Sequence, residues 1–148
     1  MGYDFQLNTL TQLFKQNEHK ENSMRMAQYM KGHFSYFGIK SPLRKKLQRE
    51  WWQGQYIKYE SELVTLISGL WELEEREFQN VALDLGKRYK KYLSPNSIPF
   101  TQNLVMTKSW WDTVDAIASH FVGAVVYNSP ETGKIMDEWI DHKNMWIR

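Results

Sequence analysis

Apolar residues recur three and four positions apart along almost the whole chain, which is the spacing of one face of an α-helix. This pattern predicts helices over about residues 4–16, 21–31, 41–51, 58–70, 72–92, 100–107, 110–127 and 129–140. No alternating pattern of useful length indicates a strand, and the short ambiguous run from Val122 to Tyr127 fits the helix around it. We therefore predict an all-α protein.

Glycine and proline residues separate these helices. Gly32 and Gly38 interrupt the pattern before the Ser-Pro pair at 41–42, which fits an N-cap and a first-turn proline, and residues 94–99 form a second break. Short helices joined by tight breaks are typical of antiparallel helix pairs stacked into an array. We predict antiparallel helix pairs stacked into an array, with residues 1–148 forming a single domain.

Composition narrows the classes of protein further. The chain has no cysteine, which excludes disulfides and thiolate metal sites, and its four histidines are scattered without ligand spacing, so we expect no metal centre. It lacks both an apolar run of the roughly 18 residues needed for a membrane span and a basic-then-apolar leader at the start. We therefore expect a soluble, cytoplasmic protein that does not bind membranes.

Basic residues are unevenly distributed, although the formal net charge is only +2. The first cluster consists of Lys40, Arg44, Lys45, Lys46 and Arg49. We interpret it as a contact surface for the DNA backbone, since affinity for duplex DNA comes largely from phosphate contacts. The second cluster consists of Lys87, Arg88, Lys90 and Lys91. It closes a predicted helix that opens with glutamates, an arrangement that the helix dipole favours without any ligand, so we interpret it as mostly structural.

The segment from Lys108 to Asp115 carries the strongest chemical signal. Trp111 and Asp115 are four residues apart and share one face of the predicted helix, at the edge of its apolar stripe. Ser109 and Asp112 fit a capping box, which would explain Asp112 structurally. Asp115 lies beyond the cap, so it has either a functional role or a nearby lysine or arginine as its partner.

Four blocks of the sequence, in this order along the chain, resemble one family. They are Gly38-Ile39-Lys40-Ser41-Pro42-Leu43-Arg44, Trp71-Glu72 with Arg76-Glu77-Phe78-Gln79, Lys108-Ser109-Trp110-Trp111-Asp112-Thr113-Val114-Asp115, and His142-Lys143-Asn144-Met145-Trp146-Ile147-Arg148. The chain is similar in these blocks to the AlkD-like DNA alkylation repair family, the helical-repeat glycosylases that excise alkylated purines. The tryptophan–aspartate block is the most specific of the four.

The resemblance implies an α-α superhelix of HEAT-like repeats, which makes residues 1–148 a single helical-repeat domain. It also implies a concave basic surface that binds duplex DNA, with an active cleft formed by Trp111, Asp115 and Arg148. It implies hydrolysis of the N-glycosidic bond of N3- or N7-alkylated purines by a monomeric enzyme that needs no metal or organic cofactor. It also implies that the damaged nucleotide stays stacked in the duplex during the reaction.

The end of the chain differs from the family pattern. Family members continue beyond the Trp-Ile-Arg block with further helices, whereas this chain stops at Arg148, which we predict to lie a few residues into a helix. We therefore expect residues 1–148 to correspond to the N-terminal two thirds of a longer family domain. The alternative function is a non-catalytic helical scaffold that binds DNA or protein. The Trp111–Asp115 pair favours the enzyme, because a scaffold has no need of it.

Overall fold

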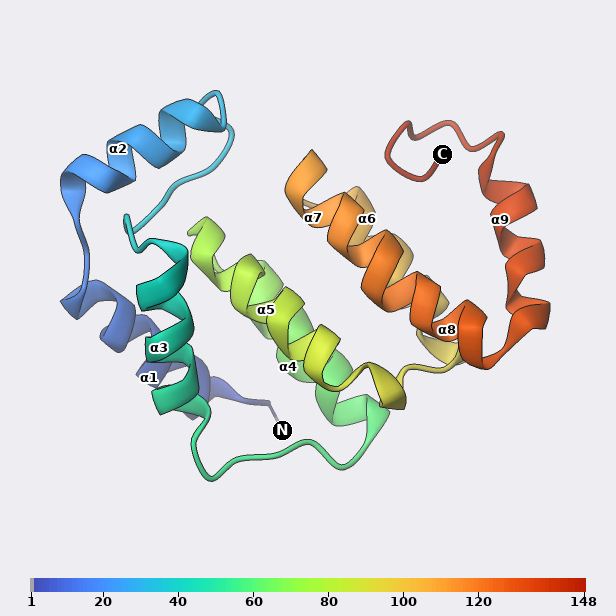
Figure 1. Cartoon of the computed structure of the whole chain (residues 1–148), viewed down its shortest axis with the longest axis horizontal. Helices are drawn as coiled ribbons and strands as arrows, with labels where there is room; N and C mark the ends of the chain where they lie inside the picture. Colours follow the sequence, from blue (N-terminus) through green and yellow to red (C-terminus); the bar gives the residue numbers. More distant parts are fainter. Residues whose placement is uncertain (1) are drawn as a thin grey trace. The chain divides into compact units, whose positions relative to one another are not determined.

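The computed structural model describes residues 2–148, which form helices joined by turns (Figure 1). The elements are α1 (Asp4–Gln16), α2 (Lys20–Tyr29), α3 (Ser41–Trp52), α4 (Glu60–Glu72), α5 (Arg76–Arg88), η1 (Lys90–Tyr92), η2 (Pro95–Ser97), α6 (Ile98–Met106), α7 (Trp111–Ala116), η3 (Ile117–Val122), α8 (Gly123–Asn128), η4 (Pro130–Gly133) and α9 (Lys134–Trp139). Helix makes up 71% of the structure and residues 2–148 contain no strand, so the all-α prediction is confirmed. None of these helices has the length and apolar character needed to cross a membrane.

Two of the predicted helices have different bounds in the structure, and hydrogen bonds explain one of the differences. The α4 helix begins at Glu60 rather than residue 58, because the backbone N–H groups of Lys58 and Tyr59 donate to the Glu62 carboxylate at 2.8 and 3.2 Å. The helix predicted over 72–92 is shorter at both ends, since a bend at 73–75 precedes α5 and the 3-10 segment η1 follows it. The two lysines of the second basic cluster that follow Arg88 therefore lie outside α5.

The chain divides into two compact units, and each has its own core. The first unit comprises the chain up to Ile57 together with Thr65–Ala82. Phe14 of α1 lies at its centre, with ring centroids 5.9 Å from Phe37 and 5.5 Å from Phe78. All three rings are buried, and burial of aromatic rings of this size is a main source of core stability.

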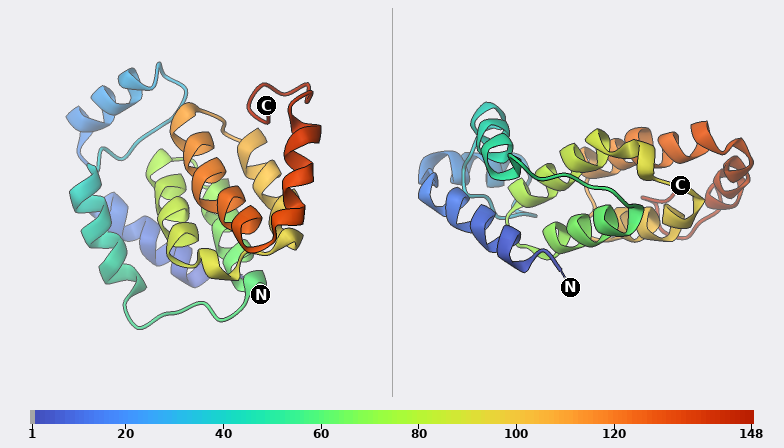
Figure 2. Two further views of the ribbon diagram at one scale, coloured as in Figure 1. Left: turned by 45° about the vertical axis from the view of Figure 1, so that its right-hand side comes forward. Right: turned by 90° about the horizontal axis from the view of Figure 1, so that it is seen from below.

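The second unit comprises Lys58–Val64 and Leu83–Arg148. In it α6 runs antiparallel to the helix formed by α7, η3 and α8, and the two lie side by side in both views of Figure 2. Gly86 of α5 packs so closely on Phe121 that a Cβ at this position would lie 2.1 Å from the phenylalanine ring. The unit is also tied together by Glu60, whose carboxylate accepts hydrogen bonds from Ser94 and Ser97.

The helix predicted over 110–127 is continuous but changes type in the middle. Residues Ile117–Val122 form a π turn, in which the Gly123 N–H donates to the Ala118 carbonyl five residues earlier. Its core-facing residues are Thr113, Ile117, Phe121 and Val125, each fully buried and each four positions after the last. In an uninterrupted α-helix a spacing of four drifts by about 40° per step. The wider π turn reduces this drift and keeps the four side chains on one buried line.

Candidate active site and nucleic-acid interface

Trp111 and Asp115 both lie on the exposed face of α7. The helix starts at Trp111, so the two side chains are one turn apart on its surface, and the Trp111 side chain is 57% exposed. Asp115 is also exposed, and its carboxylate has no hydrogen bond or ion pair among residues 2–148. The alternative interpretation of Asp115 as a salt-bridge partner therefore has no counterpart in the described part of the chain.

The predicted capping box at the start of this helix was wrong. The N-cap residue is Trp110, and its side chain makes no capping hydrogen bond. The Ser109 hydroxyl instead donates to the Val105 carbonyl at the end of α6. Asp112 still serves the first turn, because its Oδ1 accepts the Thr113 N–H at 2.8 Å. The physical reason is that Ser109 lies one residue too early for its oxygen to reach the free amides of α7.

Trp146 contacts both tryptophans at the start of α7. Its ring centroid lies 4.9 Å from that of Trp111, edge to face, and 6.2 Å from that of Trp110. Sequence reasoning had placed Trp146 in a matching block without giving it a role. The contact brings the C-terminal segment to the candidate catalytic helix, and Arg148 comes two residues after Trp146.

The prediction that Arg148 lies within a helix was wrong. Residues 140–148 form turns, and the backbone N–H groups of Ile147 and Arg148 both donate to the Asn144 carbonyl, at 3.1 and 3.4 Å. The Asn144 side chain in turn accepts the Trp146 N–H at 2.9 Å. These local bonds compete with helix formation, as asparagine side chains often do. Arg148 itself is exposed.

A cavity of about 210 Å³ lies beside this turn. Arg148, Trp146 and Val114 line it together with apolar residues of α6, η3 and α9. Trp111 and Asp115 are not among its lining residues, so the two exposed side chains face solvent rather than this hollow.

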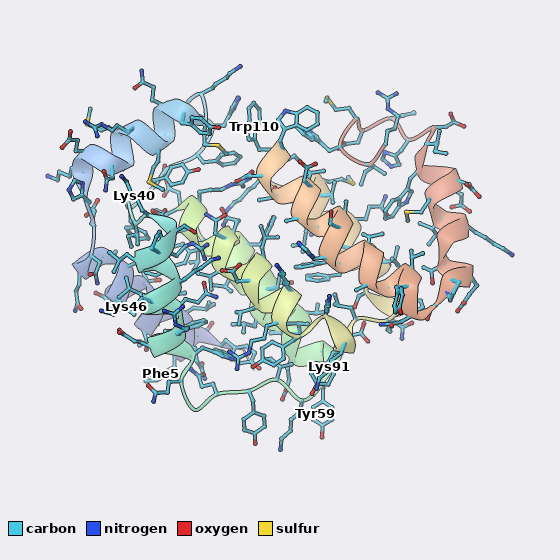
Figure 3. All side chains as sticks on the ribbon, viewed as in Figure 1. Phe5, Lys40, Lys46, Tyr59, Lys91 and Trp110 are labelled. Atoms are coloured by element: carbon cyan, nitrogen blue, oxygen red, sulfur yellow. The ribbon has the colours of Figure 1, made fainter. Side chains whose placement is uncertain are left out.

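The first basic cluster lies along α3 in the first unit (Figure 3). Lys40, Lys45, Lys46 and Arg49 are exposed. Arg44 is the exception, since it is only 7% exposed and its guanidinium donates to the Gln48 side chain at 2.9 Å. Four of the five predicted contacts are therefore accessible to a phosphate, while Arg44 packs within the unit.

The backbone entering α3 is fixed by a buried carboxylate. The two carboxylate oxygens of Glu77 accept the N–H groups of Phe37, Gly38 and Ile39 at 3.1, 2.9 and 3.1 Å. Burial raises the pKa of Glu77 above its usual range, against the opposing effect of these backbone donors. Gly38 has φ +92°, and a Cβ there would lie 2.1 Å from the His19 carbonyl oxygen. The sequence marks Gly38 as a break between helices and Glu77 as one of the acidic residues that open a helix, but it does not predict that the two meet.

Arg76, next to Glu77, is the largest fully buried side chain of the first unit. Its guanidinium carbon lies 3.7 Å above the Phe34 ring, and its backbone N–H donates to the Ser35 carbonyl at 2.8 Å. A guanidinium over an aromatic face gains cation–π attraction as well as packing. Together with Glu77 it holds residues 34–39 against the start of α5, which fixes the direction from which the exposed lysines of α3 emerge.

No group of three or more histidine, aspartate or glutamate side chains that could hold a metal ion occurs within residues 2–148.

Comparison with known proteins identifies the family. The family model for DNA alkylation repair enzymes matches residues 10–148. The chain belongs to the DNA alkylation repair enzyme family. The match spans almost the whole chain and includes both the basic cluster on α3 and the Trp111–Asp115 helix. The family resemblance drawn from the sequence is therefore confirmed.

A solved member of similar structure supports this assignment. The chain is similar to a predicted DNA alkylation repair enzyme from Enterococcus faecalis, with 28% sequence identity and a TM-score of 0.77. The similarity covers 88% of this chain and 61% of the other, so the chain spans less than two thirds of that relative's length. No match to a curated protein was found.

Proposed function

We propose that this member of the DNA alkylation repair family is a DNA glycosylase. Its reaction is hydrolysis of the N-glycosidic bond of N3- or N7-alkylated purines in duplex DNA. The observation that carries the proposal is the exposed Trp111–Asp115 pair on the first turns of α7, in which the carboxylate has no protein partner within residues 2–148. An unpaired carboxylate next to an exposed indole is available to a ligand.

The chemistry required of Asp115 is modest. A purine alkylated at N3 or N7 is cationic and is already a good leaving group. As its bond to the sugar breaks, positive charge develops on the sugar as an oxocarbenium-like species. A carboxylate near that sugar stabilises the charge and orients the attacking water, as the carboxylates of glycoside hydrolases do. No metal or organic cofactor takes part in these steps.

Trp111 and Arg148 have supporting roles in this mechanism. The indole face attracts the same cation. The Trp111 ring packs against Trp146, so it is oriented before the substrate arrives. Arg148, two residues from Trp146, binds a phosphate next to the damaged nucleotide through its guanidinium. The exposed basic residues of α3 contribute phosphate contacts elsewhere on the duplex.

We further propose that the damaged nucleotide remains in the stack. Glycosylases that extrude a base need a pocket that encloses it. The cavity beside the C-terminal turn is lined mainly by apolar residues, without Trp111 or Asp115. An exposed carboxylate on a helix surface fits an approach from the backbone side of the duplex.

The decisive experiment is release of free base from duplex DNA that carries 7-methylguanine, with undamaged duplex as the control. The expected result is a time-dependent release of 7-methylguanine alone that Asp115→Asn suppresses. Binding of duplex DNA without release of any alkylated base would instead support the non-catalytic scaffold.

A further inference from the structure

A second cavity, of about 420 Å³, opens on the exposed side of the catalytic helix in the second unit. Its lining residues are Lys90, Lys91, Ser119, His120, Gly123, Ala124, Tyr127 and Asn128. One wall is η1, the 3-10 segment that follows α5, and the other wall is the π turn and α8. The cavity lies entirely within one compact unit.

The chemistry of the lining fits an anion. Lys90 and Lys91 are exposed cations, and neither makes an ion pair among residues 2–148. The opposite wall offers the hydroxyl of Ser119, the imidazole of His120 and the side-chain amide of Asn128, all of which can donate hydrogen bonds. No carboxylate lines the cavity to compete for the lysines. Such a set of donors binds phosphate oxygens.

The helix type explains how these donors come to face the lysines. Ser119 and His120 lie within the π turn, and π turns occur frequently at functional sites. Gly86, near the end of α5, allows the closest approach of α5 to Phe121 in this turn. The chain then leaves α5, and Lys90 and Lys91 of η1 line the same cavity as Ser119 and His120.

The cavity is also in line with the candidate catalytic residues. Trp111, Asp115, Ser119, Gly123 and Tyr127 are all exposed and follow one another at intervals of four. In an uninterrupted α-helix Trp111 and Tyr127 would be separated by about 160° around the axis. The π turn lowers the rotation per residue and so reduces this angle, just as it does on the buried line from Thr113 to Val125.

We propose that this cavity is a phosphate-binding site that holds the DNA backbone on the same helix face as Asp115. The inference rests on the proposed function for its substrate, duplex DNA, but not on Asp115 as the catalytic group. From Asp115 to Tyr127 the helix rises roughly 18 Å. Phosphates of one strand recur about every 3.4 Å along the duplex axis, so the phosphate held here is up to about five nucleotides from the damaged one.

The test compares two double variants that remove the same charge from neighbouring positions. Lys90→Ala/Lys91→Ala removes both cations from the cavity, and Lys87→Ala/Arg88→Ala removes two exposed cations from the last turn of α5, outside the cavity. Affinity for an undamaged duplex is measured as a function of salt concentration. Each phosphate that the protein no longer binds lowers the log–log salt slope by about 0.9, so the slope of the cavity variant should fall by roughly 1–2 and that of the control variant by clearly less. Equal reductions of the salt slope in the two variants would overturn the proposed site, because the lysines would then act only through the overall positive charge of the protein.

A neutral-phosphate scan locates the contact. Methylphosphonate groups are placed singly at each of the first six positions on either side of 7-methylguanine. At one position about five nucleotides away or nearer, the substitution should weaken binding by the wild type but not by Lys90→Ala/Lys91→Ala. A cavity variant that stays as sensitive as the wild type at every position would overturn the proposal.

A free phosphate compound is the other source of the same chemistry. Binding of deoxyadenosine monophosphate is therefore measured alongside duplex DNA. If Lys90→Ala/Lys91→Ala lost only the mononucleotide and kept its full affinity for duplex, the cavity would serve a small ligand and the DNA assignment would be wrong. The proposed glycosylase function can be contradicted independently of this site. If the wild type binds duplex DNA through the cavity but releases no 7-methylguanine, the phosphate site is supported and the glycosylase function is wrong.

Discussion

The indole rings of Trp111 and Trp146 meet edge to face, with their centroids 4.9 Å apart. This contact joins the first turn of α7 to the turn that carries Arg148, and it lies one helical turn from Asp115. An aromatic pair of this geometry contributes about 0.5–1.5 kcal/mol of stability in addition to the contribution of its buried area. The orientation of Trp111 therefore depends on a residue that takes no part in the chemistry.

Trp146→Ala should slow base release by roughly 2- to 10-fold, which corresponds to the loss of one aromatic pair. The expected cause is that Trp111 and the Arg148 turn lose their common support. Trp146→Phe keeps an aromatic ring against Trp111 and should retain most of the rate. Single-turnover rates on a 7-methylguanine duplex check both variants, and equal rates for the Ala and Phe variants and the wild type would show that Trp146 does not position Trp111.

Asp115→Asn should lower the rate of base release by about 10²–10³, because it removes a charge placed where positive charge develops in the transition state. DNA binding should stay the same or improve, since the duplex is itself an anion. The matched control is Asp112→Asn, which removes one negative charge from the same turn but keeps an oxygen that can accept the Thr113 N–H. It should cost about 0.3–1 kcal/mol of stability through the helix dipole and little activity. If Asp112→Asn lowered the rate of base release more than Asp115→Asn, the catalytic role would belong to Asp112.

Removing the exposed basic residues of α3 should weaken duplex binding whatever the sequence. For Lys45→Ala/Lys46→Ala/Arg49→Ala we expect the log–log salt slope to fall by about 0.9 for each phosphate that is no longer bound. Arg44→Ala should behave differently, because Arg44 is buried and bonded to Gln48. It should lower the free energy of unfolding by about 1–3 kcal/mol and leave the slope nearly unchanged. An unchanged slope in the triple variant would make this surface an ordinary solvated helix face.

Glu77 should give the protein a distinctive pH dependence. Its pKa is raised in the folded state by burial, so the folded protein binds this proton more tightly than the unfolded chain does. The contribution of this proton to stability is fully present below the unfolded pKa of about 4.5 and is lost as pH rises through the folded pKa. The free energy of unfolding of the wild type, measured relative to Glu77→Gln, should therefore fall as pH rises from about 4.5 and then level off. If this difference in unfolding free energy rose with pH over the same range, the three backbone N–H donors would lower the pKa of Glu77 more than burial raises it.

Gly38→Ala tests how closely the segment before α3 is packed. The substitution combines a positive φ with a Cβ 2.1 Å from a backbone oxygen of His19. Gly54→Ala is the matched control, since Gly54 has φ +77° and nothing within 4 Å of the added Cβ. Backbone strain alone should cost Gly54→Ala about 1–2 kcal/mol of unfolding free energy. Gly38→Ala should cost clearly more, as thermal or urea unfolding would measure, and equal losses would mean that His19 moves aside freely.

The sequence predicted most of the helices because their apolar residues follow the helical repeat closely, as on α1 and α6. It also predicted the family from short blocks whose residues carry a physical role. Its errors have local causes. Ser109 bonds back to α6 instead of capping α7, and Asn144 turns the chain where a helix was expected. Which of these hydrogen bonds forms depends on small energy differences between competing partners, and the spacing of apolar residues in the sequence does not reveal those differences.

The candidate site was only partly predictable. Trp111 and Asp115 could be named because both lie on one helix, where spacing fixes their relation. Trp146, the burial of Arg44 and the cavity at Lys90 and Lys91 could not be named, because they depend on contacts between elements that are distant in sequence. One signal for the π turn was present: Ile117, Phe121 and Val125 keep a constant spacing of four, whereas an α-helix alternates between three and four.

That π turn makes the catalytic helix tolerant of one change in length. The wider turn holds one extra residue without extra rotation about the helix axis, so deleting one residue from Ile117–Val122 would allow the segment to close as an ordinary α-helix, with no break in its hydrogen bonding. Tyr127 and Asn128 would then keep nearly the same direction relative to Asp115. The same deletion in the α-helical part that follows would instead turn every later side chain by about 100°. The π turn is thus a place in this helix where a one-residue indel leaves the exposed face in register with the tryptophan–aspartate pair.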